Sequence, residues 1–323
     1  MILLRDDEIR ILLDWPTLVE ALRQGHRRGV DLIERLLLSE PSAAPVEQNH
    51  LLIWPAWRFR EYCGAKLATV FPGNAKGSTR PTNSTVYVLF DGRDGRVLAV
   101  IEGSEFTLRK TAADSALAAT YLARKDAETL LMVGAGAQAY AQIRAICAVR
   151  PSLARVLIWN RTSSKAQALA KRLSKEGVAA RAIRELAPAI SGAAIISMAT
   201  AARAPVLEGV HLSPGTHIDL VGSFTPDMRE CDDETIRRAS LFVDTRRFTV
   251  ETTGDLAIPI AARLIGPDDI RADLFELARG RHKGRSSIDE ITLFKNGGGG
   301  HLDLMTAIAA YERAARAQSA EPD

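Results

Sequence analysis

A glycine-rich turn in the middle of the chain is the first feature of this sequence that could do chemistry. Residues 134–139 read Gly-Ala-Gly-Ala-Gln-Ala and match the pattern G-x-G-x-x-G/A, with Ala139 in the third small position. Gly134 allows a tight bend and Gly136 carries no side chain, so backbone N–H groups can reach a pyrophosphate. The motif follows the apolar run "TLLMV" and opens a helical stretch, which is the context that it requires. We therefore predict dinucleotide binding at Gly134, Gly136, Ala137 and Gln138.

The end of the next expected strand indicates which dinucleotide is bound. It reads "WNRTSSK", residues 159–165, where an NAD-binding domain would carry an acidic residue for the ribose 2′-hydroxyl. Hydrogen-bond donors and positive charges suit a 2′-phosphate instead. The alternative is that Arg161 simply lies on the surface. The sequence favours NADP(H), with NAD(H) as the alternative, and assigns this end of the cofactor to Asn160, Arg161, Thr162 and Lys165.

These residues must be positioned by a sheet and its helices. From about residue 111 an Ala-rich helix (111–124) is followed by short apolar strands that alternate with helical stretches, among them 163–175 and 229–239. Apolar strands separated by helices are typical of a parallel sheet that is covered on both faces. We predict an α/β fold, a Rossmann-type doubly wound parallel sheet, for this part of the chain.

The residues before this sheet predict a smaller α+β unit. A helix is expected over 14–38, with Asp14 as its N-cap and Pro16 in its first turn, followed by a connection over 39–50. Short, mostly antiparallel strands follow, with a turn at 91–95 and with Trp54 and Trp57 expected in the core. The chain closes with an amphipathic helix from His301. Among the other histidines, His26 and His282 are expected to be solvated, and His211 and His217 to be structural.

The amino-acid composition limits the classes of protein to which the chain can belong. The chain has 323 residues, 46% hydrophobic and 25% charged, with a net charge of +3, which predicts two globular domains. Basic residues are interleaved with acidic ones, which argues against nucleic-acid binding. Three cysteines without disulfide or metal spacing, and no signal-peptide core or membrane span, favour a cytoplasmic protein without a bound metal.

An ordered series of segments resembles the ornithine cyclodeaminase/μ-crystallin family. The segments are "GAKLATVFPGN" (64–74), "RPTNSTVYVLFD" (80–91), "TLRKTAADSALAATYLAR" (107–124), "VGAGAQA", "WNRT" and "LFKNGGGGHLDL" (293–304). The resemblance covers about residues 50–310. It implies a homodimer, with residues 1–112 and 300–323 forming a split substrate-binding and dimerisation domain around a Rossmann domain at 113–299. It also implies a reaction through an imine beside the nicotinamide, on a small-molecule substrate.

The resemblance assigns roles to residues of the first domain. Lys66 matches the family's active-site lysine, and burial on an apolar strand would lower its pKa and allow it to bind a carboxylate or protonate an imine. The alternative is a lysine at the strand edge that reaches solvent. Thr82 matches a threonine close to the cofactor. Lys110 stands where most relatives have a carboxylate-binding arginine, and Arg109 precedes it, so both are candidates for substrate binding.

The resemblance also assigns the remaining strand ends of the Rossmann domain. Asn296 is expected on the cofactor side and Gly297 beside the substrate, with Gly298 continuing their loop; the alternative for "NGGGG" is a flexible linker. His301, which follows these glycines, could touch a ligand. The other cofactor-binding residues expected at strand ends are Ala199, Thr200, Val221, Gly222 and Ser223.

Two departures from the family pattern bear on the reaction. The substrate-binding arginine expected before "IWPAW" is absent between Arg35 and Arg58, and Gln48, Asn49 or His50 could take its place. Phe224 stands where the cyclodeaminase and alanine-dehydrogenase branches carry an aspartate. Asp227, three residues on, is a candidate catalytic residue or alternatively the cap of the next helix.

The first hypothesis is therefore an NADP(H)-dependent reductase of cyclic imines such as Δ1-pyrroline-2-carboxylate or Δ1-piperideine-2-carboxylate. The alternatives are an ornithine cyclodeaminase that releases ammonia, an enzyme like alanine dehydrogenase, and a protein that binds NADPH without turnover.

Overall fold

Two compact units make up the chain. The structure is a computed structural model that describes residues 1–40, 48–75 and 79–320. Contacts between residues group Met1–Lys110 with Gly299–Asp323 in unit 1 and place Thr111–Gly298 in unit 2. Unit 1 is therefore discontinuous in sequence, and unit 2 is inserted into it. The substrate-binding and dinucleotide-binding roles expected for these units remain predictions.

Unit 1 is built on a sheet of seven strands. Its order is β1 (Ile2–Leu4), β7 (Val97–Glu102), β6 (Asn83–Asp91), β5 (Tyr62–Val70), β4 (His50–Arg58) and β2 (Asp31–Leu32), and β3 (Leu36–Ser39) also pairs with β4. Strands β4 to β7 form an antiparallel meander, and β1 joins β7 in parallel. This is the α+β arrangement that the short strands of the sequence predicted.

The last helix of the chain packs on this sheet. Unit 1 contains α1 (Asp6–Leu12), α2 (Trp15–Arg28), η1 (Pro72–Ala75), the start of α3 (Gly103–Leu122) and α11 (Gly300–Ala320). Helix α11 contacts β4, β5, β6 and α2. A Cβ atom at Gly300 would lie 2.6 Å from the Pro55 carbonyl oxygen, so the helix begins directly on β4. The first turn of α11 is thereby held close to the strands of the meander.

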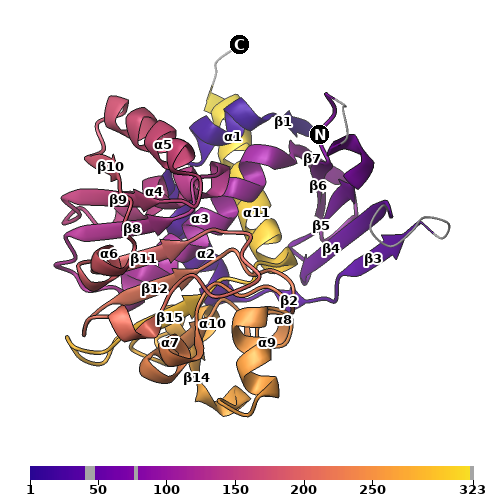
Figure 1. Cartoon of the computed structure of the whole chain (residues 1–323). Coiled ribbons are helices and arrows are strands. Elements are labelled where there is room, and N and C mark those ends of the chain that lie inside the picture. The colour runs from indigo at the N-terminus through magenta and orange to yellow at the C-terminus, as the bar shows by residue number, and fades with distance from the viewer. Residues whose placement is uncertain (41–47, 76–78, 321–323) are drawn as a thin grey trace. The chain divides into compact units, whose positions relative to one another are not determined.

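Unit 2 is a parallel sheet of eight strands. The order is β10 (Ala180–Ala182), β9 (Arg155–Trp159), β8 (Thr129–Val133), β11 (Ile195–Met198), β12 (His217–Leu220), β15 (Thr292–Lys295), β13 (Ser240–Val243) and β14 (Ile270–Asp273). All of these strands pair in parallel. The predicted doubly wound α/β fold is confirmed, and Figure 1 shows its helices on both sides of the strands.

The two faces of this sheet bury different helices. Leu130 and Met132 of β8 pack in one cluster with α4 (Ala137–Val149) and α5 (Ser163–Lys175). Leu131 and Val133 pack in the other with α6 (Ala187–Ser191), α7 (Asp233–Arg238) and α9 (Gly254–Ala261). Strands covered on both faces are mostly apolar, which explains the short apolar runs in the sequence. The shorter elements are α8 (Arg246–Thr249), α10 (Leu274–Ala278), η2 (Gly209–His211) and η3 (Pro267–Asp269).

Several sequence-based boundaries were wrong. The helix expected over 14–38 ends at Arg28, because Gly29 adopts φ 91° and turns the chain into β2 and β3. Much of the connection expected over 39–50 lies outside the described residues. The helix expected from residue 111 begins at Gly103, and the one expected over 229–239 covers only Asp233–Arg238.

Three side chains also differ from expectation. His26 is fully buried rather than solvated, and Trp57 is 44% exposed rather than part of the core. Asp232, not Asp227, caps α7, since its carboxylate accepts from the Thr235 amide at 2.8 Å. His217 is buried against the Thr292 hydroxyl and is structural, as predicted.

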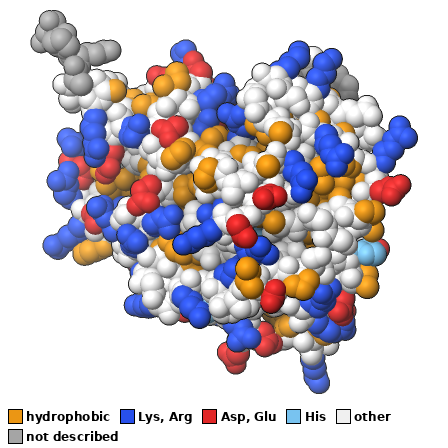
Figure 2. All heavy atoms as spheres, turned by 90° about the vertical axis from the view of Figure 1, so that its left-hand side faces the viewer, with side chains coloured by type: hydrophobic (Ala, Val, Ile, Leu, Met, Phe, Trp, Pro, Cys, Tyr) orange, Lys and Arg blue, Asp and Glu red, His pale blue; other side chains and the backbone are white. Residues whose placement is uncertain are grey.

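The surface carries mixed charge. Figure 2 shows one face on which Lys and Arg side chains are interspersed with Asp and Glu. Among residues 1–40, 48–75 and 79–320, no helix is long and apolar enough to cross a membrane. The same described residues contain no group of three His, Cys, Asp or Glu arranged to hold a metal ion.

Candidate functional site

The glycine turn after β8 has the geometry of a phosphate-binding loop. Gly134 adopts φ +122°, and a Cβ atom there would lie 2.5 Å from the Ala199 carbonyl oxygen, so the position requires glycine. Gly136 is the N-cap of α4, and a Cβ atom added to it would meet no heavy atom within 4 Å. The first N–H groups of a helix have no partners inside the helix. The open space beside Gly136 therefore fits a diphosphate bound at the start of α4.

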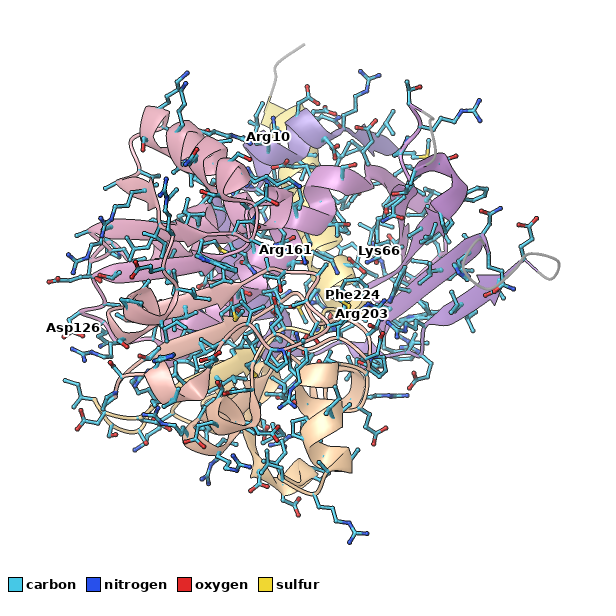
Figure 3. All side chains as sticks on the ribbon, in the orientation of Figure 1. Arg10, Lys66, Asp126, Arg161, Arg203 and Phe224 are labelled. Atoms are coloured by element: carbon cyan, nitrogen blue, oxygen red, sulfur yellow. The ribbon has the colours of Figure 1, made fainter. Side chains whose placement is uncertain are left out.

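The end of β9 presents polar and basic groups. The Asn160 side-chain amide donates to the Thr162 carbonyl at 3.0 Å, and Thr162 is the N-cap of α5. Arg161 and Lys165 are exposed, and Arg161 forms no ion pair within the described part of the chain. Figure 3 shows Arg161 and Asp126 at opposite ends of the strands of the parallel sheet. Arg161 thus lies at the carboxyl edge, where ligands of such sheets bind.

A buried carboxylate joins the ends of β11 and β12. Glu230 is fully buried, and its carboxylate accepts from the Thr200 amide at 2.8 Å, the Thr200 hydroxyl at 2.7 Å and the Gly222 amide at 2.6 Å. A Cβ atom at Gly222 would lie 2.0 Å from the Thr200 carbonyl oxygen, so only glycine fits between these strand ends. Two of the predicted cofactor-binding residues, Thr200 and Gly222, are therefore held in fixed positions by Glu230.

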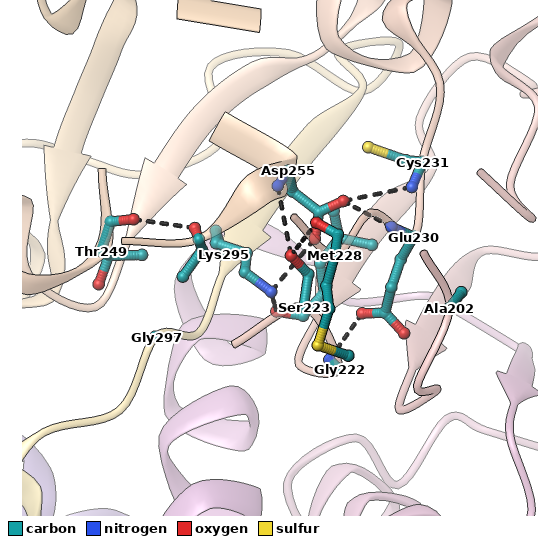
Figure 4. A network of polar contacts seen from close by, with 12 residues as sticks. Ala202, Gly222, Ser223, Met228, Glu230, Cys231, Thr249, Asp255, Lys295 and Gly297 are labelled. Carbon is teal, nitrogen blue, oxygen red and sulfur yellow. Dashed lines mark hydrogen bonds and ion pairs between the residues drawn. The ribbon is translucent and has the colours of Figure 1, made fainter. Parts of the chain in front are cut away.

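A second buried carboxylate supports the first (Figure 4). Asp255 accepts from the Glu230 amide at 2.7 Å and forms an ion pair with Lys295 at 3.2 Å. The Ser223 hydroxyl donates to the Met228 carbonyl at 2.6 Å. Burial raises the pKa of Glu230, although Lys295 opposes this shift. The network connects the ends of β12 and β15 with the loop that leads to α7.

The "NGGGG" segment is anchored and is not a flexible linker. The buried Asp244 carboxylate, at the end of β13, accepts from the amides of Gly297 at 3.0 Å and Gly298 at 2.6 Å. Burial raises the pKa of Asp244 to about 6, although these hydrogen bonds oppose the shift. The Asn296 side-chain amide donates to the Thr111 carbonyl and the Ser115 hydroxyl, both at 3.1 Å. The linker alternative is wrong.

Unit 1 contains a buried group of two lysines and one aspartate. Lys66 lies on β5, and its ammonium is 3.0 Å from Oδ2 of Asp303 on the first turn of α11. The Lys110 ammonium is 2.8 Å from Oδ1 of the same carboxylate. Asp303 is fully buried, and the two lysines are nearly so. Lys66 is therefore not the solvent-reaching lysine of the alternative interpretation, and we refer to the three residues as the Lys66–Asp303–Lys110 cluster.

The surroundings of the cluster bring the pKa of Lys66 close to neutral pH. Burial lowers the pKa of Lys66 to about 8; Asp303 opposes this shift and Lys110 adds to it. The Lys66 ammonium also lies 4.3 Å from the centre of the Trp54 ring, a cation–π contact. Tyr87 is opposite Lys66 on β6, and burial raises the pKa of its phenol well above the usual value. Lys66 can therefore either bind an anion or release a proton near neutral pH.

The two adjacent basic residues of α3 occupy different environments. Consecutive helical side chains point about 100° apart, and only Lys110 joins the cluster. Arg109 forms an ion pair with Glu105 at 2.8 Å and donates to the Leu13 carbonyl at 2.6 Å. Its guanidinium also stacks 4.4 Å from the centre of the Trp15 ring. Lys110 thus lies with Lys66, whereas Arg109 is held by Glu105 and Leu13, and substrate binding by either remains a prediction.

Asp227 does not lie in a buried site. Its side chain is 57% exposed, pairs with Arg203 and accepts from the Thr225 hydroxyl at 2.6 Å. Phe224, three residues before Asp227 in the sequence, is 62% exposed. This placement gives no support to the predicted catalytic role of Asp227.

Other candidates in unit 1 have structural contacts. Thr82 precedes β6, and its carbonyl accepts from the Phe71 amide at 2.8 Å. His50 contacts the Ser39 hydroxyl at 2.9 Å, and Gln48 and Asn49 donate to Glu40 at 2.8 and 2.7 Å. The three candidates for replacing the loop arginine are thus engaged at the ends of β3 and β4.

The sequence patterns do not single out the acidic partners of the site. Asp303 lies in the predicted last helix, and a carboxylate within "HLDLMTAIAA" is a detectable signal because a buried charge needs a partner. Glu230, Asp244 and Asp255 carried no such signal, since their sequence surroundings are mixed. His301 is also buried, and its ring centre is 5.9 Å from that of His26.

The chain is similar to known proteins over nearly its full length. Residues 17–318 match the model of the ornithine cyclodeaminase/mu-crystallin family. A Delta(1)-pyrroline-2-carboxylate reductase of Paracoccus denitrificans is 44% identical over 299 residues, which cover 93% of this chain and 92% of that protein.

Two solved structures have the same fold over 98% of this chain. The Delta(1)-pyrroline-2-carboxylate reductase of Thermococcus litoralis, in complex with NADH and L-proline, has a TM-score of 0.89 at 31% identity, covering 98% of its own chain. The iminosuccinate reductase of Paracoccus denitrificans, in complex with NAD+, has a TM-score of 0.88 at 28% identity, covering 97% of its own chain.

The environment of Lys66 predicts an unusual titration. We expect one lysine side chain to lose its proton with a midpoint near pH 8, so that it is about nine-tenths charged at pH 7 and mostly neutral above pH 9. NMR of carbon-13-labelled lysine Cε atoms across this range measures it, and Lys66→Met identifies the resonance by removing it. A spectrum in which every lysine titrates above pH 10 would contradict the expectation.

Proposed function

The chain belongs to the ornithine cyclodeaminase/mu-crystallin family, and from this membership we propose that it is an NAD(P)H-dependent reductase of cyclic imines. The proposed substrate is Δ1-pyrroline-2-carboxylate, which is reduced to proline; Δ1-piperideine-2-carboxylate is a second candidate. The proposal is supported by the reductases that resemble this chain over nearly its full length. The structural observation that carries it is the buried Lys66–Asp303–Lys110 cluster, which provides charge for a carboxylate and a proton for an imine.

The cluster supplies two functions that this reaction needs. The substrate carboxylate pairs with the Lys66 ammonium, and Lys110 offsets the negative charge of Asp303. Reduction of the C=N bond adds a hydride to carbon and requires a proton on nitrogen. Because the pKa of Lys66 is about 8, its ammonium is acidic enough to help supply that proton near neutral pH.

The cofactor is proposed to bind at the carboxyl edge of the parallel sheet. Gly134, Gly136, Ala137 and Gln138 would hold the pyrophosphate at the start of α4, where the space beside Gly136 is open. The reduced nicotinamide supplies the hydride when bound. Asn160, Arg161, Thr162 and Lys165 would contact the adenosine ribose. We propose a preference for NADP(H), because these residues offer positive charge and no carboxylate.

The reductase assignment predicts turnover that depends on Lys66. Addition of Δ1-pyrroline-2-carboxylate should oxidise NADPH, followed at 340 nm, and Lys66→Met should lower kcat/KM by about 100-fold or more because the carboxylate and the proton both lose their partner. Lys175→Met, on the exposed side of α5, is the matched control and should leave the rate unchanged.

Two results would contradict this assignment. One is no oxidation with several cyclic imines although NADPH binds. The other is ammonia release from ornithine without a net change in absorbance, which would indicate a cyclodeaminase.

The cofactor preference predicts a selective effect at Arg161. Arg161→Ala should raise the KM for NADPH about tenfold or more, because one charge-assisted contact to the 2′-phosphate is lost. The KM for NADH should change little, and Lys171→Ala on α5 should affect neither cofactor. An equal rise of the KM for both cofactors would show that Arg161 does not recognise the 2′-phosphate.

We also propose that the protein is a homodimer formed through unit 1. Leu36, Leu37 and Leu38 of the edge strand β3 are 53–57% exposed, and Phe59, which follows β4, is 72% exposed. Exposed apolar side chains on a strand that pairs with only one other strand of the described residues are typical of an association surface.

The proposed assembly predicts a mass near twice the chain's 35.1 kDa by sedimentation. Leu37→Glu should shift the protein toward the monomer, since a charge would replace an apolar contact, whereas Val210→Glu, at an exposed position of unit 2, should not. A wild-type protein that sediments as a monomer at micromolar concentration would refute this assembly.

A further inference from the structure

Asp303 makes the charge of the cluster smaller than its two lysines suggest. We propose that Asp303 is a specificity-determining residue, which leaves the cluster one net positive charge and so selects substrates with one carboxylate over substrates with two. This inference rests on the proposed function and refines its substrate class. It assigns a role to a residue of the last helix that the sequence patterns did not single out.

The charge of the cluster follows from its ion pairs. The two oxygens of the Asp303 carboxylate are divided between the lysines, with Oδ2 at 3.0 Å from Lys66 and Oδ1 at 2.8 Å from Lys110. No second carboxylate of the described residues pairs with either lysine. Two ammonium groups and one carboxylate leave a charge of +1 in a region where Asp303 is fully buried.

Tyr87 and His301, two titratable neighbours of the cluster, carry no charge. Trp54 of β4 covers Lys66 with its ring. Tyr87 of β6 stays protonated, because burial and the charge of Asp303 raise the pKa of its phenol. His301 of α11 stays neutral, because burial lowers its pKa well below the usual value. His26 of α2 lies against the His301 ring, with its Nδ1 2.8 Å from the Leu22 carbonyl oxygen.

The exposed fractions indicate where a ligand enters. The Lys66 side chain is 9% exposed, that of Lys110 is 3% exposed, and Asp303 is not exposed at all. Lys66 is the most exposed of the three, so we take it as the residue that a ligand carboxylate meets first. One carboxylate brings the cluster to neutrality. A second carboxylate would find no free cation in the cluster, and an uncompensated buried charge is strongly unfavourable.

Substitution of Asp303 by asparagine tests the charge while preserving the side-chain shape. Without the Asp303 carboxylate, the two lysines can accept two negative charges when both are protonated. Lys66 also becomes easier to deprotonate, since Asp303 opposes the lowering of its pKa. Binding of a dicarboxylate to Asp303→Asn should therefore take up protons at pH 7.5. Asp303→Glu keeps the charge and is the matched control.

Stable planar probes make the measurement independent of turnover. Titration calorimetry with pyrrole-2-carboxylate and pyrrole-2,5-dicarboxylate, in the presence of NADPH and in two buffers of different ionisation enthalpy, gives affinity and proton uptake together. We expect the wild-type protein and Asp303→Glu to prefer the monocarboxylate at least tenfold. In Asp303→Asn the ratio of the two affinities should shift at least tenfold toward the dicarboxylate, with added proton uptake.

A second experiment asks whether the Asp303→Asn substitution compensates for the loss of the Lys110 charge. Lys110→Met reduces the charge of the cluster to zero and should lower the affinity for the monocarboxylate at least tenfold. The double variant Lys110→Met/Asp303→Asn returns the charge to +1 and should recover part of that loss. A merely structural role for Asp303 predicts a double variant that binds more weakly than either single one.

The outcomes separate this inference from the proposed function. Three results would overturn the role of Asp303. They are an equal loss of affinity for both probes in Asp303→Asn, no compensation in the double variant, and a wild-type protein that binds neither probe. Failure of the proposed function is a different result, namely that the wild-type protein binds the monocarboxylate with NADPH but reduces no cyclic imine.

Discussion

The pairing of two buried ammonium groups with one buried carboxylate is the constraint on which unit 1 depends. Asp303 compensates the buried charge of Lys66 and Lys110, because an unpaired ammonium in an apolar environment is destabilising. The carboxylate comes from the first turn of the last helix, although both lysines lie within the first 110 residues of the chain. This requirement gives a physical reason for the discontinuous unit, in which α11 returns to the sheet of β4, β5 and β6.

Unit 2 uses buried carboxylates in a different way. Glu230 and Asp244 each accept two or more hydrogen bonds from backbone amides at the carboxyl edge of the parallel sheet. Asp255 fixes Glu230 and is paired with Lys295. Loops at a sheet edge have few backbone partners of their own, and a buried carboxylate satisfies several amides at once. The loops expected to hold the cofactor are thus ordered by the protein itself.

Local patterns predicted elements well where one physical cause dominated. The strands of unit 2 were recognisable because burial on both faces requires continuous apolar runs, and the turn at Gly134 because only glycine fits its φ of +122°. Prediction was wrong where competing causes met. The segment 14–38 has helical composition, but Gly29 and the pairing of β2 and β3 with β4 end the helix at Arg28. His26 resembled a solvated residue because its neighbours in sequence are charged, whereas its side chain points into the contact with α11.

The sequence by itself determined the fold class, the family and the position of the glycine turn, since each is recognised from short continuous segments. It also singled out Lys66 and the pair Arg109 and Lys110. Only the tertiary structure decided that Lys110 joins Lys66 while Arg109 binds Glu105, because helix orientation selects between adjacent side chains. Only the tertiary structure identified Asp303 as their partner. The ion pairs join residues separated by more than 190 positions, and long-range packing of charge leaves no periodic pattern in a single sequence.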